Sequence, residues 1–242
     1  MIILATCQAK SKGVYFLRSL ILCADKNYKA QVSEEDDMST LAEELILSLK
    51  KLGVHYVFGI PGGPSIPYME AMRKHNMEFV LTANEQSAAI MAGMFGVLTG
   101  TPGVCHATFG PGATNLATGV GGALLDRLPL IALTTEVSDS DIGRKVQMNI
   151  DHQALYRPIS KQTFRMSPDN YGEILQTAFA LATEELPGSV HIGLPTGIER
   201  CSVEECGEFM TKRKSALPDD VLLSAAINML AAAKKPLIAI GL

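Results

Sequence analysis

The segment that most constrains the fold runs from Thr82 to Asp126 and reads as helix, strand and helix. Glu85 begins the first helix, a short apolar run at 103–108 is typical of a buried strand, and the turn at 109–112 opens the second helix. Strands and helices that alternate at this pace predict an α/β fold, with a parallel sheet flanked by helices on both faces. Such sheets bind ligands beyond the carboxyl ends of their strands, so we expect a site near Glu85 and this turn.

Further elements of the same kind lie on both sides of this segment. Thr40 and Glu43 form a capping box, which predicts a helix that ends at Gly53. The remaining expected elements are strands at 56–58, 78–81, 128–134, 163–165 and 189–194, the start of a strand at 235–242, and helices at 66–73, 113–125, 152–156, 172–186 and 221–233. In the helix that begins at Glu85, one face is expected to be buried: Ala88, Met91, Ala92, Phe95 and Leu98.

These patterns divide the chain into four parts. Residues 38–197 form the α/β domain, a polar linker follows at 198–217, and 218–242 read as the beginning of a second α/β domain. Residues 1–37 loosely imitate a signal peptide, but Arg18 interrupts the apolar run. We therefore expect 1–37 to be a poorly ordered extension and Met38 to be the natural start.

Composition excludes several classes of protein. The net charge is −4 and tryptophan is absent, which gives no electrostatic or stacking case for a nucleic-acid partner. No run of eighteen apolar residues is present, so no membrane span is expected. The five cysteines fit neither a zinc site nor a redox motif, and an odd count suits a reducing compartment, so we expect a cytoplasmic protein with no metal ligands of its own.

Two features could carry chemistry, and each has a plainer interpretation. Glu85 either stabilises a helix amino end or is a buried carboxylate that holds a proton or bonds a ring nitrogen. The turn at 109–112 either connects a strand to a helix or brings its backbone close to a ligand. This turn matches neither the Walker loop nor the six-residue dinucleotide-binding fingerprint, so phosphate binding is not indicated. His106 is expected to be a core histidine, and the sequence assigns His152 and His191 no partner.

Five segments are more specific together than any one alone: VFGIPGG, NEQSAAIMAGMFGVLTGTPGV, TFGPGATNL, LLDRLPLIALT and GSVHIGLPTGI. In order and spacing they resemble the pyrimidine-binding domain of thiamine diphosphate enzymes, above all the acetolactate synthase and pyruvate oxidase group. The resemblance covers about 39–197 continuously, and 218–242 resembles the opening of that family's central domain.

The resemblance implies an enzyme, a transferase or lyase, that acts on 2-keto acids by acetolactate synthase-like carboligation or decarboxylation. It implies that Glu85 bonds a ring nitrogen of the cofactor's aminopyrimidine and promotes its imino tautomer, which activates the thiazolium ring. Gln147 is similar to the family glutamine that reaches the reaction centre, although its spacing to Asp151 is one residue longer.

The resemblance also assigns residues to cofactor binding. Pro61 and Gly62 match the family loop beside the pyrimidine, and Pro111 and Asn115 match positions near the same ring. Phe109 departs from the serine that acetolactate synthases usually carry there. A bulky apolar ring at this position narrows or dries the pocket.

The family binds diphosphate and magnesium through a carboxyl-terminal domain with a Gly-Asp-Gly motif, which this sequence lacks. The resemblance therefore implies a fragment that is inactive alone and needs that domain from a longer chain or a partner, with flavin adenine dinucleotide (FAD) left open. It implies a homodimer or homotetramer, and the glycines 119, 121 and 122 favour self-association through 113–125. Two alternatives stay open: a pyrimidine-type subunit of a split 2-keto acid decarboxylase, and a degenerate, non-catalytic dimerisation domain.

Overall fold

The computed structural model describes residues 39–207, 209 and 218–238. The expected extension at 1–37 lies outside the described residues. So do the middle of the expected linker, at 208 and 210–217, and the last four residues of the chain. The boundaries of the four predicted parts stay predictions.

One parallel sheet organises the described domain, with its six strands in the order β2-β1-β3-β4-β6-β5. The strands are β1 (Tyr56–Ile60), β2 (Glu78–Leu81), β3 (Gly103–Ala107), β4 (Leu130–Glu136), β5 (Thr163–Arg165) and β6 (Ser189–Pro195). Every neighbouring pair runs parallel. The register sets Gly59 of β1 beside His106 of β3, and Thr134 of β4 beside Gly193 of β6.

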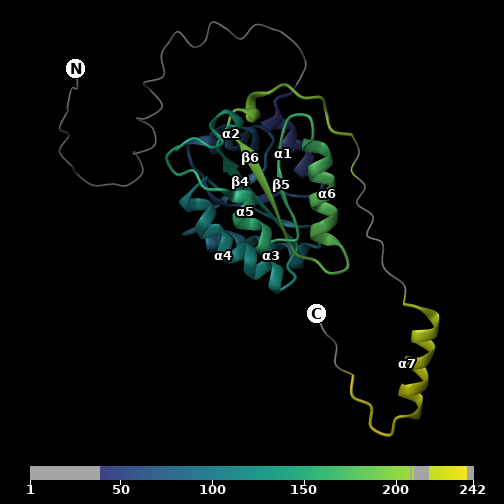
Figure 1. Cartoon of the computed structure of the whole chain (residues 1–242). Coiled ribbons are helices and arrows are strands. Elements are labelled where there is room, and N and C mark those ends of the chain that lie inside the picture. The colour runs from purple at the N-terminus through teal and green to yellow at the C-terminus, as the bar shows by residue number, and fades with distance from the viewer. Residues whose placement is uncertain (1–38, 208, 210–217, 239–242) are drawn as a thin grey trace, which may run out of the picture. The chain divides into compact units, whose positions relative to one another are not determined.

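Helices cover both faces of this sheet, which confirms the predicted α/β fold (Figure 1). One core lies under α1 (Leu41–Lys51), α2 (Ile66–Lys74) and α6 (Tyr171–Thr183). The other lies under α3 (Glu85–Thr99), α4 (Pro111–Leu125) and α5 (His152–Tyr156). Successive strand residues alternate between the two cores, as the pleat requires: Val104 faces the first and Cys105 the second.

Helix α1 begins and ends as its sequence predicts. The Thr40 hydroxyl accepts the Glu43 amide proton at 3.3 Å, and the Glu43 carboxylate reaches back to the Thr40 amide at 3.5 Å. Gly53 takes a left-handed φ of 88° just beyond the helix. Backbone bonds from Leu41 to Cys201 and from Val203 to Ser39 join the segment after β6 to the start of this helix.

The predicted buried face of α3 is partly wrong. Ala88 and Ala92 are buried, but Met91 is 44% and Leu98 80% exposed. The helix instead buries small residues, because it approaches its neighbours backbone to backbone. A Cβ on Gly119 of α4 would lie 2.6 Å from the Ala89 Cβ, so this glycine serves packing between α3 and α4 within the chain.

Helix α7 covers Asp220–Ala232, after the linker segment. The Asp219 carboxylate caps it by accepting from the Val221 and Leu222 amides. The strand expected at 235–242 is not formed over 235–238, and the rest of it lies outside the described residues. Within the described ranges, no helix has both the length and the apolar character to cross a membrane.

Candidate functional site

Two glycine-containing turns meet at the carboxyl ends of β1 and β3. We call 61–64 the first glycine turn and Phe109–Gly112 the second. A Cβ on Gly62 would lie 2.4 Å from the Thr108 hydroxyl oxygen, so the first turn contacts the residue that leads into the second. A Cβ on Gly112 would lie 3.1 Å from the Thr108 methyl carbon and 3.4 Å from Oε1 of Glu85. The two turns and Glu85 therefore form one site.

Glu85 is a buried carboxylate at the start of α3, with 8% of its surface exposed. Its Oε2 accepts a hydrogen bond from the Asn115 side-chain amide of α4 at 3.2 Å. Asn84 rather than Glu85 caps the helix, because the Asn84 Oδ1 accepts the Ser87 amide at 2.8 Å. The helix end is thus capped without the Glu85 carboxylate, which favours the chemical interpretation of this residue over the plainer one.

Gly110 is fixed as glycine by two independent constraints. Its φ of 71° lies in the left-handed region that other residues avoid. A Cβ there would also lie 2.5 Å from the Met148 carbonyl oxygen. The second turn therefore packs between Thr108 and the backbone of Met148. Met148 itself has a positive φ of 61°.

A buried histidine stands behind the first turn. The Gly62 amide donates to the Ser65 hydroxyl at 3.0 Å, and that hydroxyl lies 2.7 Å from Nε2 of His106. Burial lowers the pKa of His106 to about 4, so the ring is neutral at neutral pH. His106 is thus a core histidine, as expected, but it also supports this turn.

The second turn is held by hydrogen bonds from two of its own backbone amides, one to a threonine of β4 and one to a histidine on the face of the sheet opposite His106. The Phe109 amide donates to the Thr135 hydroxyl at 3.1 Å, and the Gly110 amide donates to Nε2 of His152 at 3.4 Å. The Tyr156 hydroxyl donates to the Ala113 carbonyl, in the first turn of α4, at 2.7 Å. Its ring stacks on His191 with centroids 3.9 Å apart.

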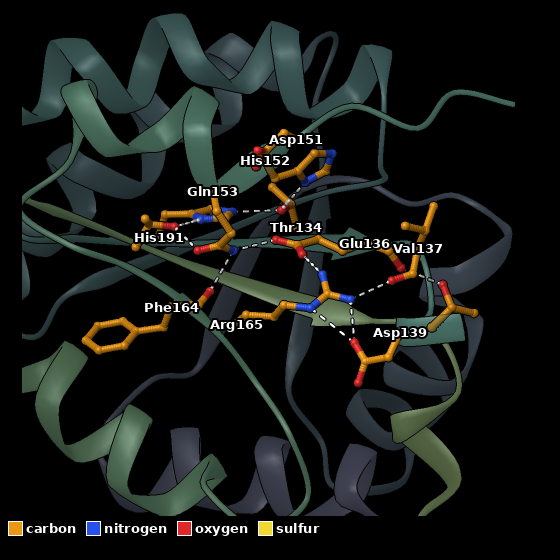
Figure 2. A network of polar contacts seen from close by, with 12 residues as sticks. Thr134, Glu136, Val137, Asp139, Asp151, His152, Gln153, Phe164, Arg165 and His191 are labelled. Carbon is orange, nitrogen blue, oxygen red and sulfur yellow. Dashed lines mark hydrogen bonds and ion pairs between the residues drawn. The ribbon is translucent and has the colours of Figure 1, made fainter. Parts of the chain in front are cut away.

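Beyond these histidines lies an ion-paired cluster around Arg165 (Figure 2). The guanidinium contacts the Glu136 carboxylate, the Val137 carbonyl at 2.9 Å and the Asp139 carboxylate at 2.8 Å. Burial raises the pKa of Glu136, while a hydrogen bond from Gln153 and the charge of Arg165 act in the opposite direction. Gly193 leaves the space for this carboxylate, since a Cβ there would collide with Glu136 Oε1.

Glu136, His152 and His191 have the composition of a metal site, with one ligand atom from each lying within 4.8 Å of the others. Their polar atoms already have partners, however. The Thr134 hydroxyl lies 2.8 Å from both Nδ1 of His152 and Nε2 of His191. The Arg165 cation occupies the carboxylate's other side. This arrangement is a hydrogen-bonded cluster, and its charge disfavours a cation.

The structure brings together most of the residues that the sequence singled out. Glu85, Asn115 and Gly62 lie around Thr108 and Gly112, and Pro61 and Pro111 belong to the two turns. Gln147 is exposed, whereas its neighbour Met148 lies against Gly110. Its predicted role stays a proposal.

Sequence reasoning missed the cluster behind the second turn. Its members are Thr134, Glu136, His152, Gln153, Thr163, Arg165 and His191. They come from four elements, and no local motif links them. The one available signal was two histidines on a predicted helix and strand.

The fold and site define an open parallel α/β domain with a buried carboxylate beside two glycine turns at the carboxyl ends of its strands. Residues 39–155 match the family described as "Thiamine pyrophosphate enzyme, N-terminal TPP binding domain". The chain therefore belongs to the thiamine diphosphate enzymes, through their N-terminal domain and within the acetolactate synthase group.

Three relatives illustrate this membership. The probable acetolactate synthase large subunit of Methanocaldococcus jannaschii is 41% identical over 159 residues, covering 65% of this chain and 27% of that protein. Acetolactate synthase isozyme 2 large subunit of Escherichia coli K12 is 35% identical over 201 residues, covering 83% and 37%. The probable 2-ketoarginine decarboxylase AruI of Pseudomonas aeruginosa is 31% identical over 208 residues, covering 84% and 37%. The chain thus spans about a third of the length of these relatives.

Proposed function

We propose that the described domain binds the aminopyrimidine ring of thiamine diphosphate, and that it acts within an enzyme that converts 2-keto acids, as acetolactate synthases do. The observation that carries the proposal is the Glu85 carboxylate, buried beside two glycine turns and oriented by Asn115. A shielded carboxylate of this kind is suited to sharing a proton with a weakly basic ring nitrogen.

The residues present fit such a ring. One oxygen of Glu85 is bonded to Asn115, and the other lies beside Gly112, which has no side chain to cover it. Thiamine diphosphate, when bound, supplies the electron sink that decarboxylation of a 2-keto acid requires. In our proposal Glu85 holds and moves the proton, Asn115 orients that carboxylate, and Pro61, Gly62 and Pro111 form the walls.

Other parts of the proposal have weaker support. Gln147 is proposed to act near the reaction centre on the resemblance alone, since its side chain is exposed here. Magnesium held by a diphosphate-binding domain and a bound flavin rest on the same resemblance. A cytoplasmic location rests on the cysteine count. We propose that the diphosphate-binding domain comes from another part of a longer enzyme or from a second chain, and that this chain alone is inactive.

Self-association is proposed through α3 rather than through the glycines of α4. Gly119 and Gly121 face Ala89 and Ile159 of the same chain, so these glycines do not indicate a surface for a second copy. Ile90, Met94 and Val97 recur along one side of α3 and are each about half exposed. We expect a Met94→Glu variant to shift the protein toward monomer in light scattering. An unchanged mass would contradict this surface as the interface.

A second candidate function is decarboxylation without carboligation. It is favoured by the relation to a probable 2-ketoarginine decarboxylase and by Phe109 at the entrance of the second turn. Product analysis with one 2-keto acid distinguishes the two reactions, because carboligation yields a 2-hydroxy-2-alkyl product and decarboxylation yields the aldehyde.

Calorimetry tests the cofactor proposal. Thiamine diphosphate with magnesium is titrated into the 242-residue chain, first alone and then mixed with a diphosphate-binding domain from an acetolactate synthase. We expect saturable binding in the mixture and weaker binding by the chain alone. Absence of binding in both cases would favour the non-catalytic alternative.

A further inference from the structure

A chain of side-chain hydrogen bonds leads from Glu136 to His152, which contacts the second glycine turn. Figure 2 shows its links from Glu136 to Gln153 and from His191 through Thr134 to His152. This hydrogen-bond chain uses groups that the proposed function leaves without a role. Five successive contacts of 2.6–2.8 Å link its members: Glu136, Gln153, Thr163, His191, Thr134 and His152. A sixth contact joins His152 to the Gly110 amide at 3.4 Å.

The direction of the first links follows from which atoms can donate. Nε2 of Gln153 lies 2.6 Å from a Glu136 carboxylate oxygen and 3.0 Å from the Phe164 carbonyl oxygen. Both oxygens accept, so the amide orientation is fixed and its Oε1 must be the acceptor for Thr163, at 2.7 Å. The single Thr163 hydroxyl proton is then used. Thr163 must therefore accept from Nδ1 of His191, at 2.6 Å.

Counting the available protons in the same way gives the direction of the remaining hydrogen bonds. Burial holds the pKa of His191 well below its ordinary value, so the ring is neutral and its Nε2 accepts from the Thr134 hydroxyl. Thr134 has no second proton and accepts from Nδ1 of His152. Nε2 of His152 is left as the acceptor for the Gly110 amide. Every proton on the path is assigned, and all links point from Gly110 toward Glu136.

We infer that these six side chains are positioning residues, which form a one-way hydrogen-bond chain that holds His152 in its Nδ1–H tautomer and thereby fixes the Gly110 amide and the second glycine turn. Through that turn they set where Gly112 lies relative to Glu85. The importance of the turn rests on the proposed function, whereas the chain and its tautomers do not.

The one-way order means that a change at a distance reaches the turn. Without the Thr163 hydroxyl, Nδ1–H of His191 loses its acceptor, and the ring is better satisfied by donating from Nε2 to Thr134. Thr134 then donates to His152, which must carry its proton on Nε2 and present it to the Gly110 amide proton. Two donors would face each other, and the contact would open.

Protonation of His152 would have the same effect on the contact with Gly110. The charged groups that act on this ring are Arg165, which disfavours the cation, and Asp151, which favours it. His191 lies on its other side, across Thr134. Burial is the largest influence and lowers the pKa of His152 to about 4. The ring is therefore neutral at neutral pH, and the hydrogen-bond chain is intact.

Nitrogen-15 NMR of the histidine-labelled 242-residue chain tests this inference directly. The ring resonances are assigned with His152→Gln and His191→Gln variants. At pH 7 we expect both wild-type rings to be neutral and to carry their proton on Nδ1. A proton on Nε2 of either ring would overturn the one-way chain, whether or not the protein binds thiamine diphosphate.

Substitution at the far end supplies the second readout. In Thr163→Val we expect the proton of His152 to move to Nε2 and hydrogen exchange of the Gly110 amide to accelerate about tenfold, the factor that loss of one hydrogen bond represents. Thr163→Ser keeps the hydroxyl and should retain the wild-type spectrum. In the control, Thr183→Val, the lost hydroxyl bonds only carbonyls of α6, so no change is expected. An unchanged His152 tautomer in folded Thr163→Val would overturn the inference.

A titration with thiamine diphosphate separates this inference from the proposed function. If the cofactor binds, Thr163→Val should raise its dissociation constant about tenfold, and Thr183→Val should leave the dissociation constant unchanged. If it does not bind at all, the proposed function fails while the tautomers still decide the inference.

Discussion

The two glycine turns of the site look alike but are supported in different ways. Each contains a glycine that has no room for a side chain, and each has a glycine amide held through a buried histidine. The hydrogen-bonded support of the first turn consists of Ser65, close by in the chain, and His106, on the adjoining strand. The second depends on residues of β4, α5, β5 and β6, which lie up to 57 positions apart in the sequence.

The two turns therefore differ in which substitutions can displace them. The two supports lie on opposite faces of the sheet, since His106 packs beside Phe79 while His191 stacks on Tyr156. Damage to the first support should stay local. Damage anywhere along the second should reach Gly110, because a chain of single hydrogen bonds is only as ordered as its weakest link.

The largest expected effect is acid sensitivity of both supports. His106 and His152 have pKa values of about 4 in the folded protein, against an ordinary value of 6.5. Between these pH values the unfolded chain binds more protons than the folded protein. The stability that the two neutral histidines contribute is therefore fully present above pH 6.5 and is lost as the pH falls toward 4. Each histidine contributes up to about 3 kcal/mol to this loss.

Urea unfolding at pH 7 and at pH 4.5 measures this acid loss. His106→Gln and His152→Gln should each reduce the difference between the two pH values, and the exposed control His55→Gln should not. A stability that is equal at both pH values in the wild-type protein would contradict neutral, buried histidines behind the turns.

The next largest effect is expected from Gly193→Ala, which attacks the second support alone. The added methyl would lie 1.8 Å from Glu136 Oε1 and 2.9 Å from Nε2 of Gln153, so the carboxylate must leave its partners. We expect a loss of about 3 kcal/mol in the free energy of unfolding. The matched control is Gly122→Ala in α4, where no atom lies within 4 Å. It should raise stability by roughly 0.5–1 kcal/mol. Similar unfolding midpoints for the two variants would count against this packing.

Arg165→Met should cost about 2 kcal/mol, because it leaves the buried Glu136 carboxylate without its cation. The cost is lower than that of breaking a fully buried pair, because the Arg165 side chain is 26% exposed and solvent screens its charge. Arg144→Met removes an exposed ion pair with Asp141 and should cost at most about 0.5 kcal/mol. Equal costs in urea unfolding would mean that the Arg165 cluster adds nothing beyond a surface pair.

The smallest effect is expected from Ser65→Ala, which isolates the first support. The Gly62 amide and the His106 ring each lose a partner, at a cost of about 1–2 kcal/mol. The NMR signals of His106 should move, while those of His152 and His191 should not. A shift in the signals of all three histidines would show that the two supports are coupled and would contradict a local first support.

Local patterns were enough to predict most of the fold. The capping box at Thr40, the helix at His152–Tyr156 and the short strand β5 were all predicted from a few neighbouring residues, and the structure confirms them. Periodicity failed on α3, where large apolar residues lie outside and small ones inside. Close backbone packing against α4 overrides hydrophobicity there, and an apolar pattern carries no information about it.

The candidate site likewise has one part that local sequence predicts and one part that it does not. Glu85 and the glycine turns could be predicted, because they lie in short segments at strand ends. The cluster of Glu136, Arg165 and the two histidines could not. Its members meet only after β4, β5 and β6 have paired in register, which sequence spacing does not indicate.

The most direct test of the proposed role of Glu85 is turnover of a 2-keto acid by the 242-residue chain mixed with a diphosphate-binding domain, comparing wild type with Glu85→Gln. The control is Glu173→Gln, an exposed glutamate in the first turn of α6. If Glu85 is the group that moves the proton, its variant should lower kcat by about 10²–10⁴-fold, and the control should leave kcat unchanged. Normal turnover by Glu85→Gln would contradict the central claim.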